Sequence, residues 1–167
     1  LGKTVQALMI LNALKCQRQD IRVLVIVPDR LVPQWRDEIF TRAHTTPVDD
    51  DTLESEFESS QYIRLAWEDQ LKNHNWSLSD IDPEKYDVIV VDELHKLTTG
   101  IQDRVVRTAP DFEHVLILTA TPAFQQAKRH AELFAILEPE RTAIARWRGA
   151  SSESEHSEDW SVDTANS

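Results

Sequence analysis

The sequence predicts an α/β fold with a doubly wound parallel sheet. Three short apolar runs, residues 23–27, 88–91 and 115–118, carry this prediction, and each is bounded by polar or turn-forming residues. None of the runs alternates apolar with polar residues, and continuous β-branched runs of this length are typical of strands that helices cover on both faces. Helical patterns separate the runs, and this alternating order favours a parallel sheet.

The first predicted element is a helix from Thr4 to about Lys15, because apolar residues recur there at near-helical spacing. Cys16, the single cysteine, is placed in this helix and is expected to be a buried core residue. The strand at 23–27 comes next. Further helices are expected at about 33–42, 66–73, 101–108 and 126–137, and a weaker strand at 62–65.

Length and composition predict one globular domain with an acidic tail. The chain has 167 residues, 41% of them hydrophobic, and a net charge of −11. Nearly all of that charge lies in residues 41–60, with six acids and one arginine, and in residues 151–167, with five acids and no lysine or arginine. We therefore expect a domain over 1–145 with an acidic loop at about 41–60, and a disordered tail rich in Ser and Glu over 146–167.

Charge and hydropathy also limit the classes of partner. Outside the two acidic segments the chain is nearly neutral, so its acidity argues only weakly against nucleic acid, which a local basic strip can bind. No apolar run reaches membrane length. We expect no membrane partner and a cytoplasmic location, associated with the nucleoid if the source is bacterial.

The chain opens with Leu1-Gly2-Lys3-Thr4, which matches the end of the phosphate-binding signature G-x-x-x-x-G-K-[ST]. In that signature backbone N–H groups surround the phosphates, the lysine reaches the β and γ oxygens, and the hydroxyl holds Mg²⁺. Such a triplet occurs by chance in about one chain of this size in ten, and an ordinary helix start is the alternative. The helix that follows favours the phosphate loop, because helix N-termini attract anions.

Polar residues follow each apolar run, at residues 28–30, 92–95 and 119–122. Doubly wound sheets bind their ligands at the carboxyl ends of the strands, where these residues would lie. We expect Asp92 to support the metal and Glu93 to orient and deprotonate the attacking water. The alternative is a surface acid pair at the end of a core strand.

Two further groups at these strand ends are expected to take part. His95 follows Glu93 by two residues and is expected near the γ-phosphate side of the site. Thr119, Ala120 and Thr121 offer small and hydroxyl side chains suited to hydrogen-bonding the acidic pair and sensing the nucleotide. For these three residues the alternative is a simple transition from strand to loop.

Four blocks, residues 2–4, 25–28, 90–95 and 118–122, resemble in sequence and order the motifs of superfamily-two helicases of the DEAH type. More narrowly, the chain resembles the Swi/Snf-type translocases of duplex DNA, and among them the bacterial RNA-polymerase-associated translocase group. Residues 1–6, 27–36 and 132–139 support this narrower resemblance, which spans about residues 1–140. Leu94 departs from the family pattern, which usually has alanine there.

The resemblance implies a RecA-like P-loop fold, the first of two such lobes, with ATP and Mg²⁺ as cofactors. It implies that the phosphates are bound by Gly2, Lys3 and Thr4, that Mg²⁺ is held by Thr4 and Asp92, and that Glu93 is the catalytic base. The residues implied to couple hydrolysis to movement are His95, Thr119, Ala120 and Thr121. Those implied to lie near the nucleic-acid backbone are Pro28, Arg30 and Trp67, with a core aromatic as the alternative for Trp67. Trp35 matches a position expected to pack in the core.

The predicted function is the ATP-binding lobe of a DNA-dependent ATPase that moves on duplex DNA. Its expected partners are duplex DNA, a second RecA-like lobe of the full-length chain, and RNA polymerase or another DNA-bound complex. The alternatives are an RNA helicase, a restriction-system translocase, and a non-catalytic interaction module. The family's strand before the phosphate loop and its second lobe are not in this sequence. We therefore expect an open slot in the core, and little ATP binding or hydrolysis by this chain alone.

Overall fold

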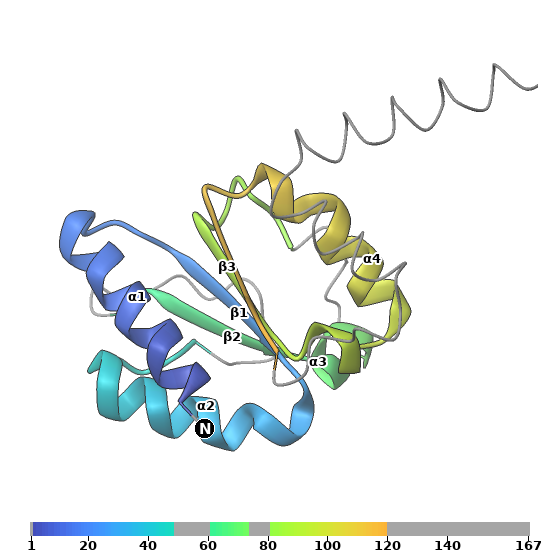
Figure 1. The fold of residues 1–167 in the computed structure, drawn as a ribbon, viewed down its shortest axis with the longest axis horizontal. Coiled ribbons are helices and arrows are strands. Elements are labelled where there is room, and N and C mark those ends of the chain that lie inside the picture. The colour runs from blue at the N-terminus through green and yellow to red at the C-terminus, as the bar shows by residue number, and fades with distance from the viewer. Residues whose placement is uncertain (1, 49–60, 74–80, 120–167) are drawn as a thin grey trace, which may run out of the picture.

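The computed structural model describes residues 2–48, 61–73 and 81–119, which form one parallel sheet with helices on both faces (Figure 1). The strands are β1 (Val23–Val27), β2 (Ile63–Trp67), β3 (Val88–Asp92) and β4 (His114–Leu118), in the order β2-β1-β3-β4. Every neighbouring pair is parallel. The predicted α/β class and the doubly wound sheet are therefore confirmed.

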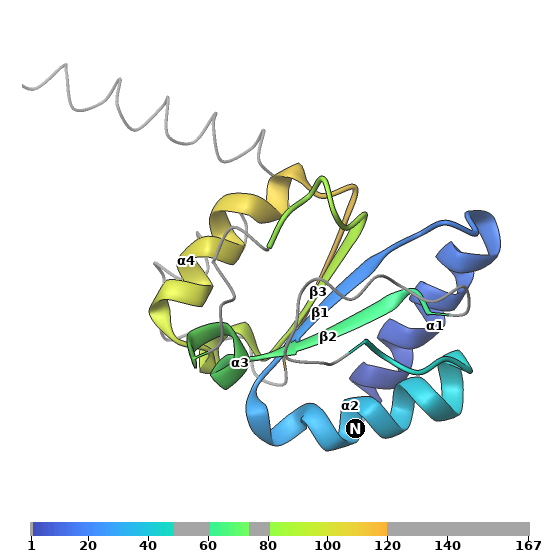
Figure 2. The same ribbon diagram turned by 180° about the vertical axis from the view of Figure 1, so that it is seen from behind.

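Helices cover the sheet from opposite sides, as Figures 1 and 2 show. The helices α1 (Lys3–Gln17) and α2 (Val32–Glu38) pack on one face, and α3 (Glu68–Asn73) and α4 (Thr99–Thr108) pack on the other. Along β1, Val23, Val25 and Val27 belong to the first layer, whereas Leu24 and Ile26 belong to the second. All five residues are buried, which explains why the run does not alternate in sequence.

The segment after residue 61 differs from the prediction in where its strand ends. The sequence predicts a helix from residue 66, but Ala66 and Trp67 pair with Ile26 and Val27 of β1. Because this pairing extends the strand, β2 runs to Trp67 and α3 begins only at residue 68. The weaker strand predicted at 62–65 is confirmed and is longer at its carboxyl end.

The two helices of the first layer also differ from the prediction in detail. The helix predicted at 33–42 is α2 followed by a π-helical turn, Ile39–Ala43, which ends at His44 with φ 52°.

Cys16 is exposed, so its prediction as a core residue is wrong. The last buried residue of α1 is Leu11, and a residue five positions later lies about 140° round the helix and points away from the sheet.

The described sheet has no gap between its strands. β1 pairs with β3, and β3 pairs with β4, so the expected open slot does not lie among these four strands. β4 is an edge of the sheet, and its residues are half-buried while those of β1 and β3 are all buried.

The predicted helix 126–137, the tail 146–167 and residues 49–60 of the acidic loop lie outside the described residues. Within the part of the chain described, none of the helices combines the length and apolar character needed to cross a membrane.

Candidate nucleotide site

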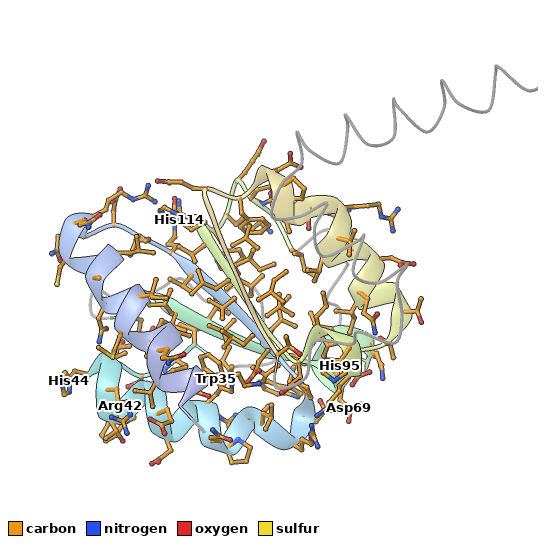
Figure 3. All side chains as sticks on the ribbon, viewed as in Figure 1. Trp35, Arg42, His44, Asp69, His95 and His114 are labelled. Atoms are coloured by element: carbon orange, nitrogen blue, oxygen red, sulfur yellow. The ribbon has the colours of Figure 1, made fainter. Side chains whose placement is uncertain are left out.

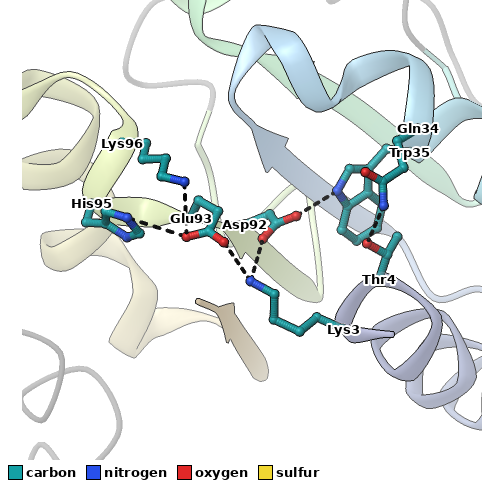
Figure 4. A network of polar contacts seen from close by, with 8 residues as sticks. All are labelled: Lys3, Thr4, Gln34, Trp35, Asp92, Glu93, His95 and Lys96. Atoms are coloured by element: carbon teal, nitrogen blue, oxygen red, sulfur yellow. Dashed lines mark hydrogen bonds and ion pairs between the residues drawn. The ribbon is translucent and has the colours of Figure 1, made fainter. Parts of the chain in front are cut away.

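The carboxyl end of β3 carries two buried acids whose side chains point to the same place. Asp92 ends the strand, and Glu93 has φ 50° and ψ 47°, the left-handed region that non-glycine residues seldom occupy. Its backbone N–H donates a 2.7 Å hydrogen bond to the Leu118 carbonyl of β4. Neighbouring side chains of an extended strand point to opposite faces. The left-handed turn lets the Glu93 carboxylate lie beside that of Asp92 (Figure 4).

Lys3, the first residue of α1, reaches both acids. Its Nζ donates a 2.6 Å hydrogen bond to Glu93 Oε1 and lies 3.9 Å from Asp92 Oδ1. Gly2 precedes the helix with φ 104°, a conformation that side chains strain to adopt, and its carbonyl accepts the Gln6 N–H. The predicted phosphate loop and the predicted acidic pair, ninety residues apart, therefore meet at one edge of the sheet.

Glu93 lies among further basic side chains. His95 Nε2 is 3.5 Å and Lys96 Nζ is 3.9 Å from Glu93 Oε2. Both belong to the 3₁₀ turn Leu94–Lys96 that follows the acid pair. The Leu94 side chain is buried in the core cluster with α4, so the departure from the family's alanine is accommodated by packing. His95 therefore lies beside Glu93, and its position on the γ-phosphate side of the site stays a prediction.

The two oxygens of Asp92 have different surroundings. Oδ2 accepts a 3.0 Å hydrogen bond from the Trp35 indole N–H, whereas Oδ1 is buried and accepts no hydrogen bond from any residue that the structure describes. Trp35 is fully buried on α2, as its expected packing role requires. The sequence does not predict the contact between Trp35 and Asp92. A buried indole N–H needs an acceptor, but nothing local in the sequence identifies an aspartate 57 residues away.

Asp92 and Thr4 fit a Mg²⁺ ion. Mg²⁺ prefers oxygen ligands and uses one or two protein oxygens together with water and phosphate. Asp92 Oδ1 is such an oxygen, and the Thr4 side chain is buried at the start of α1, with its Oγ1 3.5 Å from Gln34 Nε2. In the described ranges, no group of three or more His, Cys, Asp or Glu side chains forms a metal cage. A metal here would rely on the phosphates and water for most of its ligands.

The remaining predicted residues differ in whether the structure describes them and in how exposed they are. Thr119 follows β4 directly, while Ala120 and Thr121 lie outside the described residues. Of the residues predicted near nucleic acid, Arg30 is exposed but Pro28 is buried, so its side chain is not available at the surface. Trp67 is half-buried, and the Arg36 guanidinium lies over its ring at 5.7 Å from the centroid.

The loops that hold these residues are tied together at the same edge. Asp29, next to Arg30, accepts a 2.9 Å hydrogen bond at Oδ1 from the Asp69 N–H at the start of α3. Glu68 Oε1 accepts a 3.1 Å bond from the Thr98 N–H, in the loop after the acid pair. The segments that follow β1, β2 and β3 are therefore linked to one another by hydrogen bonds.

Comparison with protein families and curated proteins identifies relatives of this chain. A family model described as "Type III restriction enzyme, res subunit" matches residues 1–124. The RNA polymerase-associated protein RapA of Sodalis glossinidius (strain morsitans) is 31% identical over 162 residues, which cover 84% of this chain and 16% of the relative. RapA of Photobacterium profundum is 31% identical over 156 residues with the same coverage. The chain therefore spans 16% of the length of these curated relatives.

Solved structures confirm the predicted RecA-like fold. The Sulfolobus solfataricus SWI2/SNF2 ATPase core domain matches with a TM-score of 0.62 and 21% identity, covering 83% of this chain and 28% of that one. The same core in complex with dsDNA matches with a TM-score of 0.61 and 20% identity, covering 84% and 30%. The described sheet thus has the architecture of one part of such a core.

Proposed function

The chain belongs to the helicase-like family described as type III restriction enzyme, res subunit, and from this premise we propose that it is the ATP-binding lobe of a Swi/Snf-type ATPase that moves on duplex DNA. One observation carries the proposal. Lys3, at the start of α1, lies 2.6 Å from Glu93 and 3.9 Å from Asp92 at the carboxyl edge of the sheet. A lysine at a helix start, facing acids at a strand end, is the arrangement that P-loop NTPases use to hydrolyse nucleoside triphosphates.

Each side chain has a role that its position supports. The Lys3 side chain is 31% exposed, so its ammonium can move from Glu93 to the β and γ phosphates. Thr4 and Asp92 would hold Mg²⁺, which when bound neutralises phosphate charge. Glu93, turned toward Lys3 by its left-handed backbone, would accept a proton from the attacking water.

Two of the proposed coupling residues lie in segments that contact Glu93, the proposed catalytic base. His95 lies 3.5 Å from Glu93 Oε2, and the backbone of Glu93 is bonded to Leu118, the residue before Thr119. A shift of either segment would therefore move the base. We propose that His95 and Thr119, together with Ala120 and Thr121, link the state of the nucleotide to movement of the lobe.

Duplex DNA is the proposed substrate of the movement. Arg30 is exposed in the loop after β1, at the same edge of the sheet as the ATP site, and can contact a phosphate backbone. A relative of the same fold is described in complex with dsDNA. The curated relatives are described as RNA polymerase-associated. These descriptions support duplex DNA, a second lobe of the full-length protein and RNA polymerase as partners, with a location in the cytoplasm.

A restriction-system translocase is the second candidate, because the matching family model carries that description. The two candidates share the ATP site and differ in what accompanies it. Cleavage of duplex DNA by the full-length protein would favour the restriction system. Movement on DNA without cleavage would favour the Swi/Snf-type ATPase. A non-catalytic module would need none of Lys3, Thr4, Asp92 and Glu93, and all four are present.

The test measures ATP turnover by the full-length protein with and without duplex DNA. Duplex DNA should stimulate the wild type, and Glu93→Gln should lower kcat by about 100-fold or more while ATP binding is kept. Lys3→Ala should weaken both binding and turnover, whereas Lys15→Ala, on the same helix outside the site, should change neither. If Lys3→Ala and Glu93→Gln turn over ATP like the wild type, the site is wrong. Stimulation by RNA alone would favour an RNA helicase.

A further inference from the structure

Trp35 makes a contact that packing alone does not require. Its side chain is fully buried, and its indole N–H donates a 3.0 Å hydrogen bond to Asp92 Oδ2. An indole has one donor and no acceptor, so this bond uses its entire hydrogen-bonding capacity. The acceptor is a carboxylate, which makes the bond charge-assisted and stronger than one between neutral groups.

This bond fixes the orientation of the Asp92 carboxylate, so that one of its oxygens faces the site. With Oδ2 held by Trp35, Oδ1 is the oxygen that lies 3.9 Å from Lys3 Nζ and, among the described residues, finds no hydrogen-bond donor (Figure 4). Tilting the carboxylate plane away from this orientation would break the bond from Trp35 and leave a buried donor unsatisfied, which is costly, and a 180° flip only exchanges two equivalent oxygens. The indole therefore holds the carboxylate in one orientation.

Packing in the core holds Trp35 in its position. It lies in the core cluster between α1 and the sheet, together with Leu8, Val27 and Ile39, and Figure 3 shows it in the interior. Its neighbour in sequence, Gln34, places Nε2 3.5 Å from Thr4 Oγ1. Two consecutive residues of α2 thus contact the two side chains assigned to Mg²⁺.

We propose that Trp35 is a positioning residue for the metal, holding Asp92 so that Oδ1 is presented to Mg²⁺. This inference rests on the proposed function, because it needs Asp92 to bind the metal. Trp35 touches neither nucleotide nor metal in this scheme and acts only through Asp92. Gln34 has a lesser role of the same kind on Thr4, because its contact is longer and its side chain is exposed.

The test separates the N–H donor of Trp35 from its shape. In the full-length protein, Trp35 is replaced by 3-benzothienylalanine, in which sulfur takes the place of the indole N–H, and in parallel by phenylalanine. The affinity for a fluorescent ADP analogue is measured with Mg²⁺ and with EDTA. The gain from Mg²⁺ is the affinity with Mg²⁺ divided by the affinity with EDTA. We expect this gain to be about 10-fold smaller in both variants than in the wild type, as is typical when a partner of a metal ligand is removed. Affinity in EDTA should stay as in the wild type.

Two controls exclude a general loosening of α2. Ile39→Val trims the same buried face one turn later without touching Asp92, and its gain from Mg²⁺ should equal that of the wild type. In an Asp92→Ala background, replacing Trp35 should have no further effect on the gain. An effect of Ile39→Val as large as that of Trp35→Phe, or full additivity with Asp92→Ala, would overturn the positioning role.

The outcomes also separate this inference from the proposed function. If the wild type binds the analogue more tightly with Mg²⁺ but the benzothienyl variant gains equally, only the role of Trp35 is overturned. If the wild type gains nothing from Mg²⁺, the proposed metal site fails and the role of Trp35 fails with it.

Discussion

The aspartates at the two ends of β3 differ in how their carboxylates are bonded. Asp87 directly precedes the strand and Asp92 ends it. The two aspartates therefore lie at the amino and carboxyl ends of the parallel strands, and in Figure 3 His114 marks the amino end and His95 the carboxyl end. Asp87 Oδ2 accepts the Arg22 N–H at 2.7 Å, and its Oδ1 pairs with Arg18 Nη2. Arg18 also bonds Glu113 at 2.6 Å. Asp92, by contrast, keeps one buried oxygen that accepts no hydrogen bond within the described part of the chain.

This difference is what we expect if the amino end of β3 contributes to stability and the carboxyl end carries the proposed catalytic site. Partial burial alone would raise the pKa of Asp87, but the Arg22 N–H and the Arg18 guanidinium outweigh it, so that the pKa of this carboxyl is lowered. At the other end, Glu93 adopts a strained left-handed backbone beside a buried acid. Strain and incompletely satisfied oxygens are features that binding sites retain at the expense of stability.

The largest expected effect is a loss of activity that only the carboxyl end should show. Glu93→Gln should lower kcat of the full-length ATPase by about 100-fold or more, whereas Asp87→Ala should leave kcat within about 2-fold of the wild type. Glu93→Gln should change the local free energy of opening by less than about 1 kcal/mol, because Lys3 can turn to solvent. Steady-state turnover and native-state hydrogen exchange of the β3 amides measure the two quantities. A kcat for Asp87→Ala as low as that for Glu93→Gln would erase the contrast.

The second prediction concerns the stability of the amino end of β3, where Asp87 lies. Asp87→Ala should lower the free energy of local opening of β3 by about 1.5 kcal/mol, because it removes a charge-assisted hydrogen bond and an ion pair. Asp20→Ala is the matched control. Asp20 lies 3.4 Å from the same Arg18, but its side chain is 87% exposed. Hydrogen exchange in the full-length protein should show faster β3 exchange for Asp87→Ala and no change for Asp20→Ala. Equal effects would mean that Arg18 stabilises this edge without regard to its partner.

Much of this contrast could be read from the sequence, and the rest depended on distant neighbours. The run 88–91 predicts β3, which is confirmed, whereas the catalytic role of the acids after it stays a prediction. The run 115–118 looks the same, yet β4 is a half-buried edge while β3 is central. Local pattern does not distinguish them, because the exposure of a strand is set by which strands pair with it.

The same reason explains the contacts that were missed. Trp35 reaches Asp92 only because α2 and β3 pack on each other across 57 residues of sequence. Arg18 reaches Glu113 across 95 residues. Ala66 and Trp67 read as helix locally, but pairing with β1 makes them strand. Periodicity identified the elements, whereas these tertiary contacts determined the partners of individual side chains.

The smallest expected effect is the pH dependence of the amino edge. The pKa of Asp87 is lowered in the folded protein from an ordinary value of 3.8. Its contribution to stability is therefore fully present above that ordinary value and is lost as the pH falls through the lowered pKa of the folded state. The difference in β3 opening between the wild type and Asp87→Ala should be constant from about pH 7 to pH 5 and shrink toward pH 3. Hydrogen exchange corrected for the intrinsic rate at each pH measures it. A difference that persists undiminished at pH 3 would mean that Asp87 stabilises the edge through its neutral hydrogen bonds and not through its charge.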